Sequence, residues 1–173
     1  TIVSCSIFAA ISGSSVATAA TISTVAFPAM IKRGYHRNFT LGILAAGGTL
    51  GILIPPSIPM IVYAFVVEES VLSMFLAGIG PGIVLALFFI IFSVFYVIFF
   101  NKEVQNVKTS FEDKIKYTKK GLPVLLMAFI MLGGIYAGIY TPTEAGGIGF
   151  LISFIYVVTK KKLDFKGFIE AGL

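Results

Sequence analysis

Long apolar stretches separated by short polar segments dominate the chain, and this pattern predicts membrane-crossing helices. Apolar residues fill 38–67, 72–100 and, with one interruption at Thr141–Glu144, 121–159. A helix needs about 20 predominantly apolar residues to cross the hydrocarbon core of a bilayer. We therefore expect one crossing at 38–67, one at 72–100, and two transmembrane segments within 121–159.

The helix expected at 38–67 contains residues that interrupt it. The stretch Gly47–Pro59 carries three glycines and three prolines. Pro55 and Pro56 cannot continue a helix, because each lacks an N–H and its ring clashes with the carbonyl four residues back. Broken backbone at membrane depth is tolerated only where it is buried in protein or lines an aqueous cavity. We expect a discontinuous transmembrane helix with a function at its break.

Residues 1–31 predict a re-entrant helical hairpin. Small and hydroxylated residues dominate Ile11–Thr21, and the arm before them, at 1.5 Å per residue, is only about 16 Å long, too short to cross. Gly13 flanked by serines is a poor helix interior, which favours a tip at Ser12–Ser14. The alternative is a single span that packs through a face of small residues.

Charge predicts the orientation of the helices. Lys and Arg gather at 32–37, 102–120 and 160–166, whereas the polar loop at Glu68–Ser70 has none. Cytoplasmic loops carry the excess of Lys and Arg, so we expect a basic cytoplasmic loop at 101–120, in part as an amphipathic helix on the membrane surface, and a cytoplasmic amphipathic tail at 160–173. Residues 145–159 must then cross to bring the chain back to this side. The Lys160–Lys162 run fits an anchor to anionic membrane lipid.

Composition supports an all-α polytopic membrane protein. The chain is 57% hydrophobic and 12% charged, with a mean hydropathy of +0.98, whereas a soluble domain is about a quarter charged. The net charge of +5 comes from cations that flank the spans, which argues against nucleic acid as a partner. Because the chain starts at Thr1 and is apolar from Ile2, we expect a piece of a longer permease.

The hairpin tip and the broken helix together predict a cation site. Half-helix ends and freed carbonyls near the membrane midplane bind Na⁺ or H⁺ in secondary transporters. The expected ligands are two hydroxyls and the carbonyls around the break: Ser12, Ser14, Gly51, Ile54 and Pro56. No acidic residue lies between Thr1 and Val67, so a carboxylate proton relay is disfavoured there. We expect Na⁺ as the coupling ion and no organic cofactor.

Other polar residues have two interpretations each. An anionic substrate path is predicted at Ser15, Thr18, Thr49, Ser57 and Glu144. The hydroxyls of Thr18, Thr49 and Ser57 would equally satisfy nearby backbone groups. Glu144 is better explained as a cap of the helix after Pro142, where an acid is favourable in the first turn.

Four ordered motifs resemble the large membrane subunit of tripartite ATP-independent periplasmic (TRAP) transporters. They are ISGSSVATAA at 11–20, PAMIKRGY at 28–35, AAGGTLGILIPPSIP at 45–59 and GGIYAGIYTPTEA at 133–145. The resemblance implies an inverted-repeat, elevator-type transporter of the bacterial inner membrane. It also implies Na⁺ symport of organic anions such as C4-dicarboxylates or sialic acid, with a small membrane subunit and a periplasmic substrate-binding protein as partners. By this resemblance one Na⁺ site falls on the five residues named above.

Three other functions compete with this one. A stand-alone ion-coupled carrier of the same superfamily would need no binding protein. An intramembrane serine hydrolase using Ser14 or Ser15 would need an adjacent base, but the only histidine, His36, lies in a polar loop and no lysine lies within residues 1–31. A passive channel would not explain hydroxyls and broken backbone at matching depth. We therefore expect a transporter and no enzyme.

Overall fold

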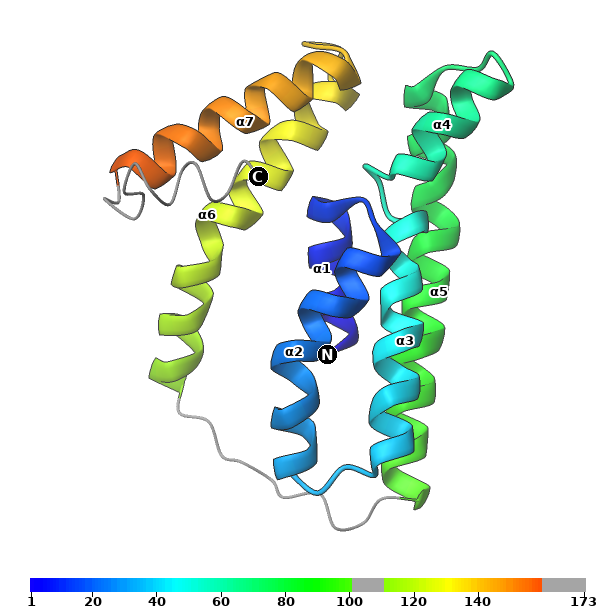
Figure 1. Cartoon of the computed structure of the whole chain (residues 1–173), viewed down its shortest axis with the longest axis vertical. Helices are drawn as coiled ribbons and strands as arrows, with labels where there is room; N and C mark the ends of the chain where they lie inside the picture. Colours follow the sequence, from blue (N-terminus) through cyan, green and yellow to red (C-terminus); the bar gives the residue numbers. More distant parts are fainter. Residues whose placement is uncertain (101–110, 160–173) are drawn as a thin grey trace. The chain divides into compact units, whose positions relative to one another are not determined.

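The described part of the protein is entirely helical. The computed structural model describes residues 1–100 and 111–159, with side chains described except at 111–120 and 124. Figure 1 shows the helices α1 (Ile2–Ser12), α2 (Ser15–Lys32), α3 (Arg37–Leu53), α4 (Ile58–Val66), α5 (Val71–Phe100), α6 (Phe111–Tyr136) and α7 (Pro142–Thr159). The prediction of an all-α protein is confirmed.

Several of these helices are long and apolar enough to cross a membrane. Among the described residues they are α2, α5 and α7, and α3 with α4 makes a further candidate that is bent by 41° at its break. This agrees with a polytopic membrane protein that contains a discontinuous helix. The chain divides into two compact units, Thr1–Ile115 and Lys116–Leu173. Each unit is described by itself below.

Residues 1–31 form two helices and not one. α1 ends at Gly13, whose φ of 62° is left-handed and whose N–H donates to the Ala9 carbonyl at 2.9 Å. Ser14 then caps α2, accepting a hydrogen bond from the Ala17 N–H at 3.4 Å. Glycine adopts this left-handed conformation without a Cβ penalty. Residues 1–31 therefore do not form one continuous helix. Because α2 alone is long and apolar enough to cross a membrane, the re-entrant hairpin stays a prediction.

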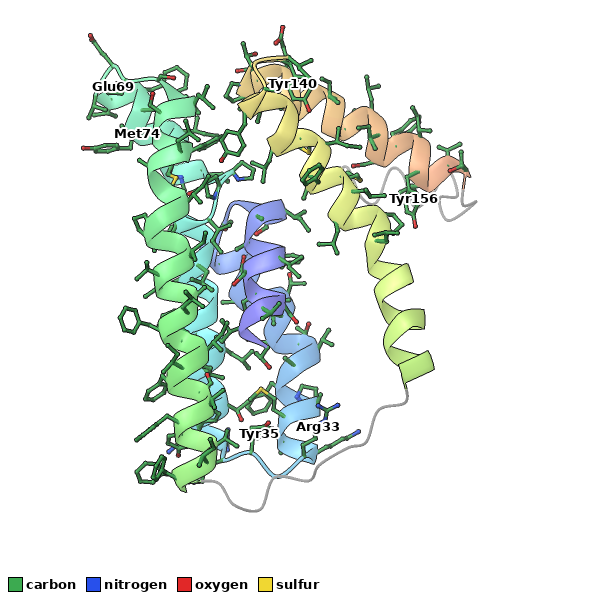
Figure 2. The ribbon with its side chains drawn as sticks, turned by 180° about the vertical axis from the view of Figure 1, so that it is seen from behind. Arg33, Tyr35, Glu69, Met74, Tyr140 and Tyr156 are labelled. Atoms are coloured by element: carbon green, nitrogen blue, oxygen red, sulfur yellow. The ribbon has the colours of Figure 1, made fainter. Side chains whose placement is uncertain are left out.

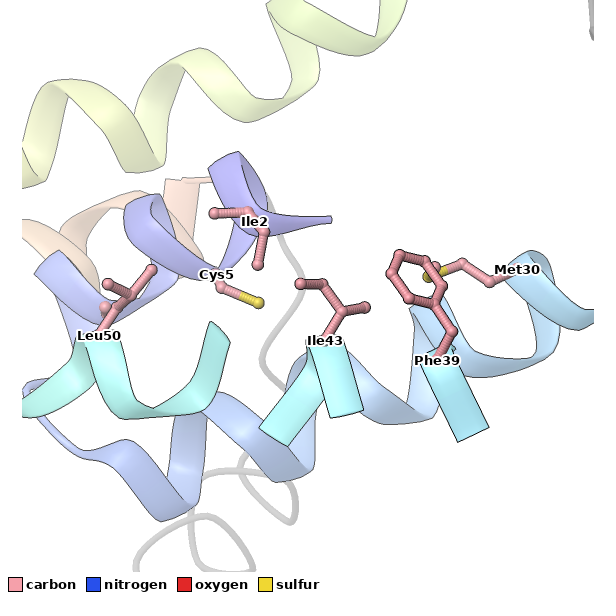
Figure 3. Packing of buried hydrophobic residues seen from close by; sticks show 7 residues of the cluster. Ile2, Cys5, Met30, Phe39, Ile43 and Leu50 are labelled. Carbon is pink, nitrogen blue, oxygen red and sulfur yellow. The ribbon is translucent and has the colours of Figure 1, made fainter. Parts of the chain in front are cut away.

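α3 is the central helix of the first unit, because both arms of the hairpin pack on it. Figure 3 shows Ile2 and Cys5 of α1 pointing toward the face of α3 that carries Ile43 and Leu50. Close approach depends on glycine: a Cβ at Gly47 would lie 2.6 Å from the sulfur of Cys5, and one at Gly48 would lie 2.6 Å from the Cβ of Ala19. Gly47 thus makes room for the Cys5 side chain of α1, and Gly48 lets α3 approach the backbone of α2 at Ala19 and Ser15.

The break in α3 is also fixed by glycines of α5. A Cβ at Gly78 would lie 2.9 Å from the carbonyl oxygen of Leu53, and Gly82 has the same oxygen at 3.4 Å. Elsewhere α5 exposes large apolar side chains, including Phe88, Ile91 and Phe95. A helix with such a surface suits lipid or further hydrophobic helices, as its sequence predicts.

Charged residues lie at opposite ends of the first unit. In Figure 2, Arg33 lies beyond the last turn of α2 and Glu69 lies in the turn after α4, at the other end of the unit. Both side chains are exposed. This separation is what the positive-inside rule requires if the two ends face opposite sides of a membrane.

The second unit is a hairpin of α6 and α7. Its turn contains Gly138, with a φ of 70°, and the Tyr140 hydroxyl donates back to the Ile130 carbonyl. Gly149 of α7 packs directly against Met131 of α6, since a Cβ there would lie 2.7 Å from the methionine sulfur. The hairpin therefore also depends on a small residue at its crossing.

The structure places helix boundaries inside two of the expected segments. Within the expected cytoplasmic segment at 101–120, residues 111–120 belong to α6, and the cytoplasmic location of the segment stays a prediction. Within 121–159, where two transmembrane segments are expected, α6 ends at Tyr136 and α7 begins at Pro142, a residue suited to the first helical turn. Residues 101–110 and the expected tail at 160–173 lie outside the described residues.

The close approach of α3 and α2 at Gly48 gives a stability prediction. We expect Gly48→Ala to destabilise the protein by about 1–3 kcal/mol, because the added methyl group overpacks the contact with α2. Gly42→Ala is the matched control in the same helix, since a Cβ there meets nothing within 4 Å. The measurement is the thermal unfolding midpoint of the purified complete protein in detergent. Equal midpoints for the two variants would contradict the packing described.

Candidate functional site

The tip of the hairpin touches the break in the α3–α4 helix. The N–H of Ile58, at the start of α4, donates to the carbonyl of Gly13 at 3.1 Å. A Cβ at Gly13 would lie 2.7 Å from the carbonyl oxygen of Pro56. The two interruptions of the backbone, far apart in sequence, therefore form one site.

The last turn of α3 also contacts the tip through bare backbone. A Cβ at Gly51 would lie 2.6 Å from the carbonyl oxygen of Ser14 and 2.8 Å from the backbone nitrogen of Ser15. These atoms belong to the main chain and cannot rotate away. Only glycine at position 51 allows α3 to come this close to the start of α2.

The prolines leave two carbonyls of α3 without their helical donors. In a regular helix the N–H groups at positions 55 and 56 would pair with the carbonyls of Gly51 and Ile52, but proline has no N–H. The Ile52 carbonyl accepts instead from the Ser57 hydroxyl at 2.8 Å, and Ser57 is fully buried. The proline at position 55 likewise leaves the Gly51 carbonyl without its helical donor.

Hydroxyl groups gather on the hairpin side of the site. The Ser12 and Thr18 hydroxyl oxygens lie 2.9 Å apart, and the Thr18 hydroxyl donates to the Ser14 carbonyl at 2.7 Å. Thr18 has 0% exposure. The site thus combines buried hydroxyls with carbonyls from an interrupted helix.

The electrostatics of the site come from helix ends. α1 and α3 end there, and the C-terminus of a helix carries a partial negative charge that attracts a cation. α2 and α4 begin there, and their N-termini attract anions. No group of three or more His, Cys, Asp or Glu able to hold a metal exists among the described residues. The polar atoms that the tip and the break bring together are hydroxyl and carbonyl oxygens, which are neutral, hard donors.

Four of the five predicted ligand residues contact one another or Gly13, and the fifth, Ile54, does not show such a contact in the part of the chain that the structure describes. Contacts join Ser12, Ser14, Gly51 and Pro56 around Gly13, as described above. Ile54 is the extended residue that terminates α3, and its side chain packs against Gly82 of α5. The side chain of Ile54 thus faces α5, and its N–H donates to the Leu50 carbonyl at 2.9 Å. Their role as Na⁺ ligands stays a prediction.

The predicted substrate-path residues separate into different environments. Ser57 and Thr18 are fully buried and satisfy backbone carbonyls. Thr49 is exposed and donates to the Ala46 carbonyl at 2.7 Å, so its hydroxyl is held by its own helix. Ser15 is half-buried in the first turn of α2. The sequence did not predict the hydrogen bond between the Thr18 and Ser12 hydroxyls. Thr18 does follow Ser14 by one helical turn, and this spacing predicts a bond from the Thr18 hydroxyl to the Ser14 carbonyl.

Glu144 belongs to the second unit and caps α7. Its carboxylate accepts hydrogen bonds from the Thr141 N–H at 2.7 Å and from the Thr141 hydroxyl at 2.9 Å. The Glu144 N–H donates back to the Thr141 hydroxyl at 3.3 Å. This reciprocal arrangement is a capping box, which supports the capping interpretation of Glu144. A role in the substrate path stays untested.

The histidine of this chain is too far along the fold to serve as the base of a serine nucleophile at the tip. His36, the only histidine in the chain, follows α2, which begins at Ser15 and runs for 18 residues. A helix of that length spans about 27 Å. Ser14 and Ser15 are therefore far from the imidazole, and the hydrolase alternative loses its chemistry.

Comparison with known proteins identifies relatives over nearly the whole chain. A family model described as "Tripartite ATP-independent periplasmic transporter, DctM component" matches residues 1–171. The C4-dicarboxylate TRAP transporter large permease protein DctM of Pseudomonas aeruginosa is 42% identical over 161 residues, which cover 90% of this chain and 37% of the relative. The protein of the same name from Vibrio cholerae is 40% identical over 164 residues, covering 90% of this chain and 35% of the relative.

A relative named for a different substrate matches similarly. The sialic acid TRAP transporter large permease protein SiaM of Vibrio cholerae is 33% identical over 166 residues, which cover 95% of this chain and 38% of the relative. The chain thus spans little more than a third of the length of these curated relatives.

The capping box gives a prediction for Glu144. We expect Glu144→Ala to lower the thermal unfolding midpoint, because the N–H of Thr141 loses the carboxylate that completes the capping box. Glu144→Gln keeps an acceptor for the Thr141 N–H and is expected to stay near wild type. Thermal unfolding of the purified complete protein separates the two variants. A Gln variant as unstable as the Ala variant would show that charge, and not capping, is what the position requires.

Proposed function

The chain belongs to the DctM component family of TRAP transporters, and from this premise we propose that it contributes the first cation site of a large membrane permease. That permease would import small organic anions by Na⁺ symport. The transporter would be of the inverted-repeat, elevator type, and the α1–α2 hairpin would be re-entrant. No enzymatic activity is part of this function.

The meeting of the hairpin tip with the helix break carries this proposal. The Ile58 N–H to Gly13 carbonyl bond of 3.1 Å and the backbone contact between Gly51 and Ser14 bring four helix ends to one place. Broken helices whose ends and freed carbonyls converge are the usual ion-binding arrangement of secondary transporters. The hydroxyls of Ser12 and Ser14 and the carbonyls of Gly51, Ile54 and Pro56 are the proposed ligands.

The substrate class follows from the relatives only in outline. The relatives of this chain are named as C4-dicarboxylate, sialic acid, isethionate and ectoine transporters. Each of these four relatives nevertheless covers 84% or more of this chain. We propose an organic anion of the C4-dicarboxylate or sialic acid type, whose identity is set largely by parts of the permease outside this chain and by its binding protein.

The proposed partners follow from the same family. A small membrane subunit would brace the permease, and a periplasmic substrate-binding protein would deliver the anion. The permease is a multi-pass protein of the inner membrane, in agreement with the candidate spans of both units. The stand-alone carrier is the less favoured alternative, because the family model that matches belongs to a tripartite system.

Reconstitution tests this function directly. The complete permease, its small subunit and candidate binding proteins are placed in proteoliposomes, and uptake of labelled C4-dicarboxylate and sialic acid is measured with an inward Na⁺ gradient. We expect uptake to require both Na⁺ and a binding protein. Equal uptake with a K⁺ gradient would exclude Na⁺ coupling, and uptake without any binding protein would favour the stand-alone carrier.

The same assay tests the proposed ligands. We expect the double variant Ser12→Ala, Ser14→Ala to raise the Na⁺ concentration for half-maximal uptake by about tenfold or more, since each hydroxyl oxygen lost weakens ion binding by a hydrogen-bond-sized amount. Ser93→Ala is the control, because its hydroxyl bonds to the Phe89 carbonyl within α5. An unchanged Na⁺ dependence in the double variant would remove these serines from the site.

A further inference from the structure

We infer that Thr18 is a positioning residue of the cation site: its hydroxyl accepts the proton of the Ser12 hydroxyl, so that Ser12 presents an oxygen lone pair to the ion. This inference rests on the proposed function of Ser12 as a Na⁺ ligand. It gives Thr18 a different role from the substrate contact suggested by the sequence.

The donors and acceptors at the tip assign the protons. A hydroxyl has one proton to donate and two lone pairs that accept. The Thr18 hydroxyl donates to the Ser14 carbonyl at 2.7 Å, so its proton is already used. The 2.9 Å contact between the Ser12 and Thr18 hydroxyls must then be donated by Ser12.

This direction determines what Ser12 can offer to an ion. Its proton points toward Thr18, and the Ser14 N–H, at 3.4 Å, engages at most one of its lone pairs. A second lone pair therefore remains to coordinate a cation. A serine hydroxyl without a fixed acceptor can rotate and present its proton, which repels the ion.

Thr18 also occupies the Ser14 carbonyl, which is the other acceptor within reach of the Ser12 hydroxyl proton. The Ser14 carbonyl accepts from the Thr18 N–H at 3.0 Å and from the Thr18 hydroxyl, so both of its lone pairs are engaged. The alternative contact from the Ser12 hydroxyl to this carbonyl is long, at 3.4 Å. Without the Thr18 hydroxyl, one lone pair of the Ser14 carbonyl has no donor. The Ser12 hydroxyl can then rotate and donate its proton to that carbonyl.

Burial of Thr18 prevents water from taking over the hydrogen bonds of its hydroxyl. Thr18 has 0% exposure, so no bulk water replaces its hydroxyl when the side chain is changed. Buried polar groups that lose a partner pay the desolvation cost in full. The ordering of Ser12 therefore depends on position 18 itself.

The test compares two valine substitutions of fully buried threonines. Thr18→Val keeps the shape of the side chain and removes the hydroxyl. Thr40→Val is the matched control, because Thr40 also has 0% exposure and its hydroxyl donates to the carbonyl four residues back, that of His36, at 3.0 Å. We expect Thr18→Val alone to raise the half-maximal Na⁺ concentration for uptake, by roughly three- to tenfold.

Further readouts separate positioning from a structural role. The KM for the organic anion at saturating Na⁺ is expected to stay unchanged, and Na⁺-dependent thermal stabilisation of the purified complete permease is expected to shift to higher Na⁺ by the same factor. Thr18→Ser should restore both, whereas Thr18→Ala should not. This second pair differs only in the hydroxyl, and it decides the question if the valine variant does not fold.

A double-mutant cycle shows whether Thr18 acts through Ser12. In the Ser12→Ala background, Thr18→Val should cause no further shift in Na⁺ dependence, because the oxygen that it orients is gone. Additive shifts, or a Thr18→Val protein with wild-type Na⁺ dependence, would overturn the inference and leave Na⁺ coupling intact. A wild-type permease without Na⁺ dependence would overturn the proposed function and this inference together.

Discussion

The hydrogen bond from the Ile58 N–H to the Gly13 carbonyl, 3.1 Å long, joins two helices that are each interrupted. In an apolar environment the peptide groups at such interruptions have no water to bind and must find partners in the protein. Here the first break supplies an acceptor and the second supplies a donor. The rest of the first unit keeps these two breaks in contact.

Small residues make that contact possible. The glycines of α3 allow α1 and α2 to approach at Gly47, Gly48 and Gly51, and Gly78 and Gly82 of α5 receive the end of α3 from its other side. Without a hydrophobic driving force between helices in lipid, such close van der Waals packing is a main source of association. The same residues that hold the unit together therefore also set the geometry of the candidate site.

The chemistry of the site follows from this packing. Two helix C-termini supply negative potential without any carboxylate, and the half-buried hydroxyl of Ser12 and the buried hydroxyl of Thr18 supply further oxygen atoms. A neutral oxygen site is well suited to a transporter, because the bound ion has to leave again on the other side. Glu144, the acid beside the last predicted motif, has its carboxylate engaged in the cap of α7.

From the sequence alone came the class of protein, the positions of both breaks, and the selection of Ser12, Ser14, Gly51 and Pro56, which lie around Gly13. These features are readable because apolar length, proline and glycine act locally on the backbone. The Thr18–Ser12 link was not foreseen. Only the tertiary structure decided that Gly13 pairs with Ile58, that Ser57 satisfies Ile52 and that Thr18 orients toward Ser12. Those contacts depend on how closely helices pack and on which side chains are buried between them, and neither is encoded in local periodicity.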